Sequence, residues 1–67
     1  MNKRKLRAAM VEAGQTQKSL AQRIGISTNS MSHKVNGGNQ FTIEEATAIC
    51  DVLNITDDAT RAQIFLR

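Results

Sequence analysis

The stretch TQKSLAQRIGISTNSMSHKVNGG, from Thr16 to Gly38, decides how this chain folds. It contains two short runs with the apolar spacing of a helix, and each run follows a hydroxyl residue of the kind that caps helix N-termini. The runs predict helices over residues 17–24 and 28–35, capped by Thr16 and Ser27. Because only about three residues join the two helices, they must cross steeply, and the stretch predicts a helix-turn-helix.

Small residues stand where such a motif needs them. Ala21 lies where the second helix approaches the first, so its short side chain allows close packing. Gly25 lies in the turn, where a positive φ is expected and costs glycine little. Ile26 follows and is expected to anchor the turn in the core. We therefore place the helix-turn-helix at residues 17–36.

The rest of the chain also has helical apolar spacing, without the sustained alternation that is typical of strands. Further helices are predicted over residues 3–13, from the capping box of Thr42 and Glu45 onward, and over residues 57–66. The fold class is therefore all-α, with five short helices in one compact domain over residues 1–67. The predicted core consists of Leu6, Met10, Leu20, Ala21, Ile24, Ile26, Met31, Val35, Phe41, Ile43, Ala46, Ile49, Val52, Leu53 and Ile55.

Size and composition narrow the possible classes of protein. A domain of 67 residues has a small core, so it depends on close helix packing, a second subunit or both. Cys50 is the only cysteine and His33 the only histidine, which excludes an internal disulfide and leaves too few ligands for a closed zinc site. We expect no metal, cofactor or small-molecule ligand. No apolar run suits a signal peptide or a membrane helix, so a cytoplasmic location without membrane association is expected.

The charge of the chain is unevenly distributed. Residues 1–34 hold seven Lys and Arg against one Glu, a net charge of +6, whereas residues 35–67 hold two Arg against five acidic residues, a net charge of −3. A basic first half indicates an anionic partner for that half. An uneven but merely solvated surface is the alternative, because net charge concerns non-specific binding rather than fold.

A polar face is predicted on the helix over residues 28–35, opposite the inward-facing Met31 and Val35. Its side chains are short hydrogen-bonding groups, and Asn and Thr are suited to reading the edges of adenine and thymine in the major groove. Taken alone, the same face is also explained by solvation. The candidate base-reading residues are Thr28, Asn29, Ser32 and His33.

The segment from Gln17 to Gly38 resembles the helix-turn-helix of phage Cro proteins and repressors, the xenobiotic-response-element family. The segment FTIEEATAICDVLNI resembles the fourth helix of that family and the turn after it, so the resemblance covers about residues 3–55. It implies a lambda-repressor-like fold and a homodimer on double-stranded operator DNA, with the second helix of the motif in the major groove and half-sites about 34 Å apart. The matching residues of the motif are Gln17, Ala21, Gly25, Ile26, Ser27, Met31 and Gly37.

The resemblance also implies roles for single residues. Thr28, Asn29 and His33 match positions that contact bases, and Gln17 and Asn36 match positions that contact phosphates. Ser19, Ser30 and Lys34 are expected to assist in phosphate contact, although many members of the family have an apolar residue where Lys34 stands. The basic start of the chain opposes the dipole of its helix, which suggests phosphate contact by Lys3, Arg4, Lys5 and Arg7, with simple solubility as the alternative.

The predicted function is that of a sequence-specific transcriptional regulator, such as a phage repressor or Cro-like protein, in a bacterial cell or a phage-infected host. The alternative is an antitoxin-like protein-interaction module on the same fold. An enzyme is not expected, because the sequence offers no Ser/His/Asp set, metal cluster or phosphate loop. An apolar cluster near the C-terminus is predicted to serve dimerisation, to close the core, or to do both; its members are Ile64, Phe65 and Leu66.

Overall fold

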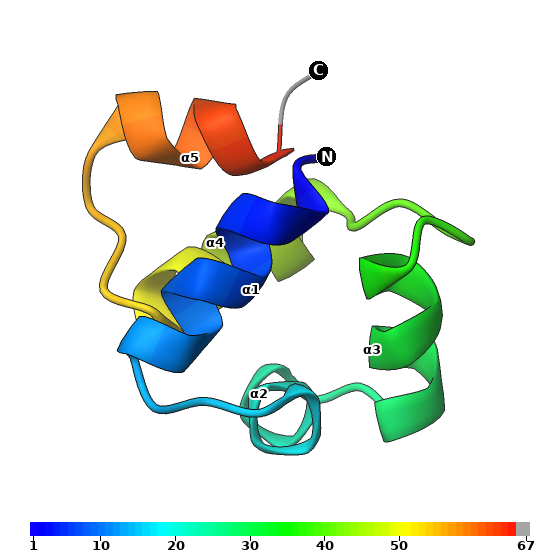
Figure 1. The fold of residues 1–67 in the computed structure, drawn as a ribbon. Helices are drawn as coiled ribbons and strands as arrows, with labels where there is room; N and C mark the ends of the chain where they lie inside the picture. The colour runs from blue at the N-terminus through cyan, green and yellow to red at the C-terminus, as the bar shows by residue number, and fades with distance from the viewer. Residues whose placement is uncertain (66–67) are drawn as a thin grey trace.

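The computed structural model describes residues 1–65, and within them the chain forms helices and turns without a strand (Figure 1). The predicted all-α class is therefore confirmed. None of the described helices is long and apolar enough to cross a membrane. The five helices are α1 (Lys3–Glu12), α2 (Gln17–Ile24), α3 (Thr28–Val35), α4 (Ile43–Val52) and α5 (Asp58–Phe65).

Hydroxyl side chains fix where three of these helices begin. The side chains of Thr16, Ser27 and Thr42 accept hydrogen bonds from backbone N–H groups three residues later, at 3.0, 3.1 and 3.0 Å. Each bond satisfies an N–H group that the first turn of a helix leaves without a partner. The predicted caps of α2, α3 and α4 are confirmed, since each cap depends only on residues close in sequence.

The last helix begins one residue later than predicted. Asp57 lies just before α5, and its carboxylate accepts hydrogen bonds from the backbone N–H of Thr60 at 2.8 Å and from the Thr60 hydroxyl. These two bonds, the hydroxyl bond foremost, lower the pKa of Asp57 below its ordinary value. Asp57 therefore stabilises the start of α5 from outside the helix.

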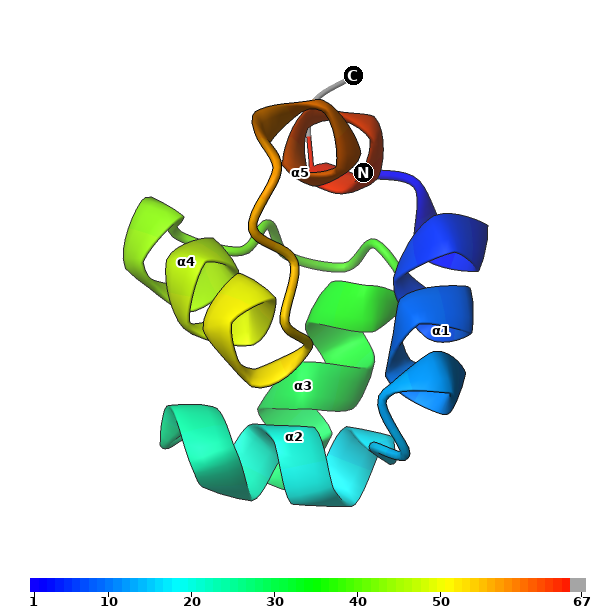
Figure 2. The ribbon, with the colours of Figure 1, turned by 90° about the vertical axis from the view of Figure 1, so that its left-hand side faces the viewer.

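The turn between α2 and α3 has the geometry that the sequence required. Gly25 has a φ of 82°, and the N–H groups of Gly25 and Ile26 both donate to the carbonyl oxygen of Ala21, at 2.9 and 3.0 Å. Ala21 itself is buried. As Figures 1 and 2 show, α2 and α3 cross steeply instead of lying side by side, which is the arrangement of a helix-turn-helix.

One apolar core lies between the helices, and Ile43 is the predicted core residue that the structure contradicts. Ile43 is 88% exposed, because it opens the first turn of α4, which projects at the periphery of the molecule (Figure 2). Phe41, two residues earlier, packs against the core instead. The buried residues are Leu6, Met10, Leu20, Ala21, Met31, Val35, Ile49, Cys50, Leu53, Ile55 and Ile64.

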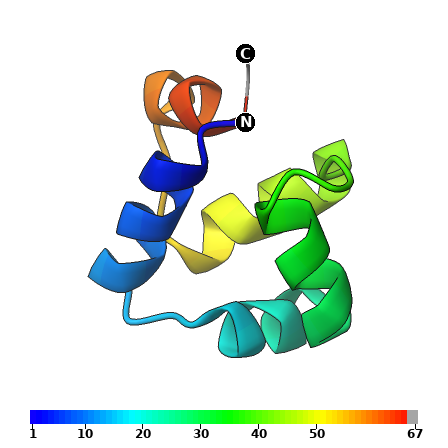
Figure 3. The same cartoon turned by 45° about the vertical axis from the view of Figure 1, so that its right-hand side comes forward.

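The C-terminal helix lies over the start of α1 (Figures 1 and 3). The backbone N–H of Asn2 donates to the carbonyl oxygen of Ile64 at 2.6 Å, and the Lys5 ammonium donates to the side-chain oxygen of Gln63 at 2.8 Å. Ile64 is only 1% exposed. Of the predicted dimerisation cluster, Ile64 therefore closes the core of a single chain, Phe65 is half-buried, and Leu66 lies outside the described residues.

Candidate nucleic-acid interface

The outward face of α3 brings the four candidate base-reading residues together. Met31 and Val35 are fully buried, so the helix is held with a fixed side toward the core. The opposite side is exposed, and Figure 3 shows α3 along one edge of the molecule. On it Thr28, Asn29 and His33 are exposed and Ser32 is half-buried.

The loop after α3 determines where the His33 ring lies. The backbone N–H of Gly38 donates to the His33 carbonyl oxygen at 2.8 Å, which folds the loop back over the last turn of α3. A Cβ atom at position 38 would lie 2.6 Å from ring atoms of His33. The ring therefore rests against the backbone of Gly38, a contact that the sequence analysis did not predict.

Asn36 joins α3 to α1. Its side-chain oxygen accepts a hydrogen bond from an Arg7 guanidinium nitrogen at 3.4 Å, and its side-chain nitrogen donates to the Ser32 hydroxyl at 3.4 Å. A predicted phosphate-contacting residue thus lies beside a predicted base-reading one. Arg7, one of the basic residues of α1 for which phosphate contact was predicted, belongs to this group as well.

Lys3 and Arg4 lie next to each other at the start of α1. Both border the surface that α1 shares with α5, near Gln63. Lys3 also borders the groove that Asn36 and Gly37 line, next to the end of α3. Of the two, Lys3 therefore lies nearer to α3.

The start of α2 carries the two other candidates for phosphate contact. Gln17 occupies the first position of the helix, where the helix dipole favours an anion. Ser19 is occupied within the protein: its hydroxyl donates to the Gln15 side chain at 2.7 Å and accepts from the Thr16 N–H at 2.9 Å. The Ser19 hydroxyl thus completes a capping box, which is a local structural role.

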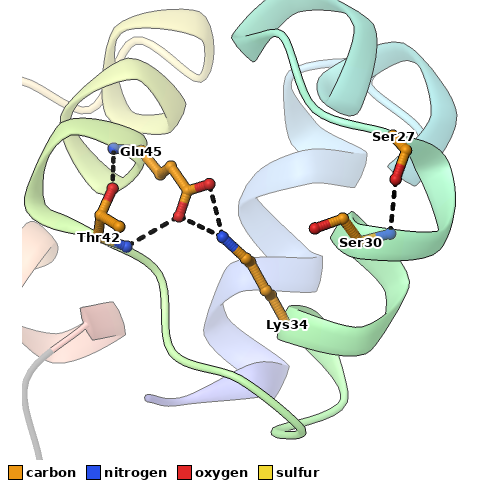
Figure 4. Close-up of polar contacts among 5 residues, drawn as sticks. All are labelled: Ser27, Ser30, Lys34, Thr42 and Glu45. Atoms are coloured by element: carbon orange, nitrogen blue, oxygen red, sulfur yellow. Dashed lines mark hydrogen bonds and ion pairs between the residues drawn. The ribbon is translucent and has the colours of Figure 1, made fainter.

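Lys34, for which phosphate contact was predicted, forms an ion pair with Glu45 in the structure. Its ammonium nitrogen lies 2.5 and 2.6 Å from the two carboxylate oxygens of Glu45, and the two side chains are only 14% and 16% exposed. Lys34 lies on the side of α3 that faces the start of α4, so its side chain reaches Glu45 (Figure 4). Ser30, four residues earlier, lies on the same side of the helix. The hydrogen bond from Lys34, with a further one from the Thr42 N–H, lowers the pKa of Glu45.

Most of the chain matches a known protein family. Residues 5–56 match the model of the Cro/C1-type HTH DNA-binding domain. The chain belongs to this family. The matched range contains the whole helix-turn-helix and α4, so the DNA-binding motif of the Cro/C1-type domain is the one formed by α2 and α3. Comparisons with curated proteins and with solved structures found no match.

The match ends before α5 and covers both partners of the ion pair between Lys34 and Glu45. Within this Cro/C1-type domain, Glu45 neutralises the positive charge of Lys34. Lys34 therefore makes a contact within the protein, between α3 and the start of α4.

Proposed function

We propose that this Cro/C1-type domain is a sequence-specific transcriptional regulator that binds double-stranded operator DNA as a homodimer in the cytoplasm of a bacterial cell or a phage-infected host. The observation that carries the proposal is the outward face of α3, where four hydrogen-bonding side chains stand on the second helix of the motif. This helix enters the major groove in the proposed complex, and the two half-sites lie about 34 Å apart.

Base contacts and phosphate contacts have separate sources in the proposed complex. The short polar residues of α3 read bases, since Asn accepts and donates to adenine and the Thr methyl group contacts thymine. Phosphates are contacted from the start of α2, both ends of α3 and the basic start of α1. Ser19 is not included, because its hydroxyl already donates to Gln15. The proposed phosphate contacts are Gln17, Ser30, Asn36, Lys3, Arg4 and Arg7, the last of which hydrogen-bonds to Asn36.

Selection from a pool of random duplexes, followed by titration with salt, tests the proposal. The chain is expected to enrich a two-fold symmetric sequence. Its affinity for that sequence is expected to fall by about 0.9 log units per log unit of salt for every phosphate that a Lys or Arg side chain neutralises. If no sequence is enriched and affinity is independent of salt, the proposed function is wrong.

Asn29→Ala tests the base-reading role directly. We expect about 1–3 kcal/mol of lost binding free energy on the selected duplex and no loss on random DNA, because a base contact is lost and no phosphate contact. Gel-shift titrations on both duplexes measure the difference. Thr47→Ala, at an exposed position of α4, is the control. An equal loss on both duplexes would instead make Asn29 a phosphate contact.

A further inference from the structure

The ion pair between Lys34 and Glu45 lies at the junction of the recognition helix with α4 (Figure 4). We propose that Glu45 is a positioning residue for base reading by α3, and that Lys34 serves inside the protein instead of contacting DNA. This inference rests on the proposed function, because it assigns the residues that hold α3 in place for the same DNA-binding face.

Glu45 is itself held from two sides. Its Oε1 atom accepts hydrogen bonds from the Thr42 N–H at 2.9 Å and from Lys34 at 2.5 Å, while its own N–H donates to the Thr42 hydroxyl at 3.0 Å. The carboxylate therefore has little freedom to follow the lysine if the lysine moves. A displacement of Lys34 would therefore break its hydrogen bonds to the Glu45 carboxylate.

The junction extends to the last helix of the chain. The Lys34 ammonium lies 5.9 Å from the centre of the Phe41 ring, and the Phe41 ring packs edge-to-face on Phe65 with 6.0 Å between ring centres. Through these contacts the last turn of α3 is joined to α4 and α5 together. The same turn carries Ser32 and His33, two of the candidate base-reading residues.

A helix as short as α3 needs such contacts to keep its orientation. Eight residues do not form a stable helix alone, so its rotation about its own axis is set by tertiary contacts. Met31 and Val35 hold one side of α3 in the core, and the ion pair adds a contact on another side, where both Glu45 oxygens lie within hydrogen-bond distance of the Lys34 ammonium. A rotation of α3 would move every base-reading side chain at once, so Glu45 acts on recognition without contacting DNA.

The same geometry argues against a phosphate contact by Lys34. Its side chain is 14% exposed, and reaching a phosphate would leave Glu45 as an unpaired carboxylate that is 16% exposed. Inside the pair, the positive charge of Lys34 is already neutralised. Lys34 therefore releases no counterion from DNA and contributes nothing to the salt dependence of binding.

Four variants test the inference against selected and random duplexes. Lys34→Met removes the charge and keeps the apolar stem, whereas Glu45→Gln removes the charge and keeps an acceptor for the Thr42 N–H. We expect each to weaken binding to the selected duplex by roughly three- to tenfold, with no loss on random DNA. The double variant is expected to be no weaker than either single variant, because both break one interaction. Lys34→Arg keeps the pair and is expected to retain affinity.

The salt dependence separates this role from a phosphate contact. We expect the slope of log affinity against log salt to be the same for Lys34→Met and the wild-type chain. A slope reduced by about 0.9, with equal losses on both duplexes, would make Lys34 a phosphate contact and overturn the proposal. Full affinity in Glu45→Gln would also overturn it. Lys18→Met, at an exposed position of α2, is the matched control for loss of a lysine charge outside an ion pair.

Folding and the underlying function are controlled separately. Circular dichroism at the assay temperature gives the folded fraction of every variant, and affinities are compared per folded molecule. If the wild-type chain itself enriches no sequence and shows no salt dependence, the proposed function fails. If the wild-type chain binds and only the variants depart from expectation, the positioning role of Glu45 fails alone.

Discussion

The contact between His33 and Gly38 shows how a single residue can depend on a backbone position outside its helix. The ring rests where any Cβ atom at position 38 would stand. A side chain that reads bases benefits from such a fixed position, because it then loses less rotamer freedom on binding. Glycine at position 38 is thus part of the candidate site, although it has no side chain to offer DNA.

Gly38→Ala is expected to displace the His33 ring, because the new methyl group would lie 2.6 Å from it. We expect base preference to decline at the position that His33 reads, as it does in His33→Ala, and no further decline in the double variant. Repeated selection from random duplexes measures the preference. Gly37→Ala is the control: its φ of 87° makes alanine costly by about 1–2 kcal/mol, but nothing lies within 4 Å of the new Cβ. Unchanged preference in Gly38→Ala would contradict this role.

Single residues also show where sequence reasoning stopped. Glu45 was correctly predicted to complete the capping box of α4, and the base-reading candidates of α3 do share an outward face. The pairing of Glu45 with Lys34 was not predicted, because eleven residues and a loop separate the two. The capping box accounted for Glu45 and the expected phosphate contact accounted for Lys34, so the sequence pattern did not indicate that the two residues pair.

At the scale of elements, α4 shows that apolar spacing along a helix does not by itself predict which residues are buried. Ile43 and Ile49 both follow the helical period of the predicted core face, yet one is 88% exposed and the other is fully buried. Periodicity identifies the side of a helix but not how far the neighbouring helices extend along it. The helix starts were predicted well, by contrast, because caps depend on residues three apart.

The same substitution at these two positions should therefore have unequal effects. Ile49→Ala is expected to lower the free energy of unfolding by about 2–5 kcal/mol, through lost burial and the cavity that remains. Ile43→Ala is expected to change it by no more than about 0.5 kcal/mol, because little apolar surface is exposed anew. Urea denaturation measures both, and each variant is the control for the other. Similar losses would mean that Ile43 belongs to the core after all.

At the scale of the whole molecule, two carboxylates couple stability to pH. The pKa of Glu45 is lowered mainly by the hydrogen bond from Lys34, and that of Asp57 mainly by the hydroxyl of Thr60. Both lowered values belong to the folded state, so the unfolded chain takes up protons first as the pH falls. The stabilisation is therefore complete above a pH of about 4.5 and is lost as the pH falls through the lowered pKa values.

We expect the stability of Glu45→Gln to be less sensitive to acid than that of the wild-type chain, because glutamine does not titrate and the contribution of Glu45 is removed. Urea midpoints measured from neutral pH down to about pH 2 give the comparison, and the range follows from ordinary carboxyl pKa values of about 4. Glu44→Gln, at the exposed neighbouring position, is the control. Parallel acid profiles for Glu45→Gln and the wild type would contradict the assignment.

Dimerisation also belongs to this scale. Removing the chain from Ile64 onward would take away a core residue, so its effect would not identify an interface. A chain that ends at Phe65 keeps every described contact. If Leu66 takes part in a dimer contact of this cluster, this shorter chain is expected to dimerise more weakly than the full chain in sedimentation experiments. An unchanged sedimentation profile would exclude Leu66 from the interface.

The hydrogen bond from Asn2 to Ile64 has a consequence for the order of folding. It joins residues near opposite ends of the described chain, whereas the turn of the motif is closed by bonds from Gly25 and Ile26 to Ala21, four and five residues apart. Closing the longer loop costs more chain entropy, so we expect the docking of α5 on α1 to form last and to open first. The amide of Asn2 should then exchange its hydrogen faster than that of Ile26, and the part of the molecule proposed to meet DNA should stay folded while the C-terminal helix detaches and returns.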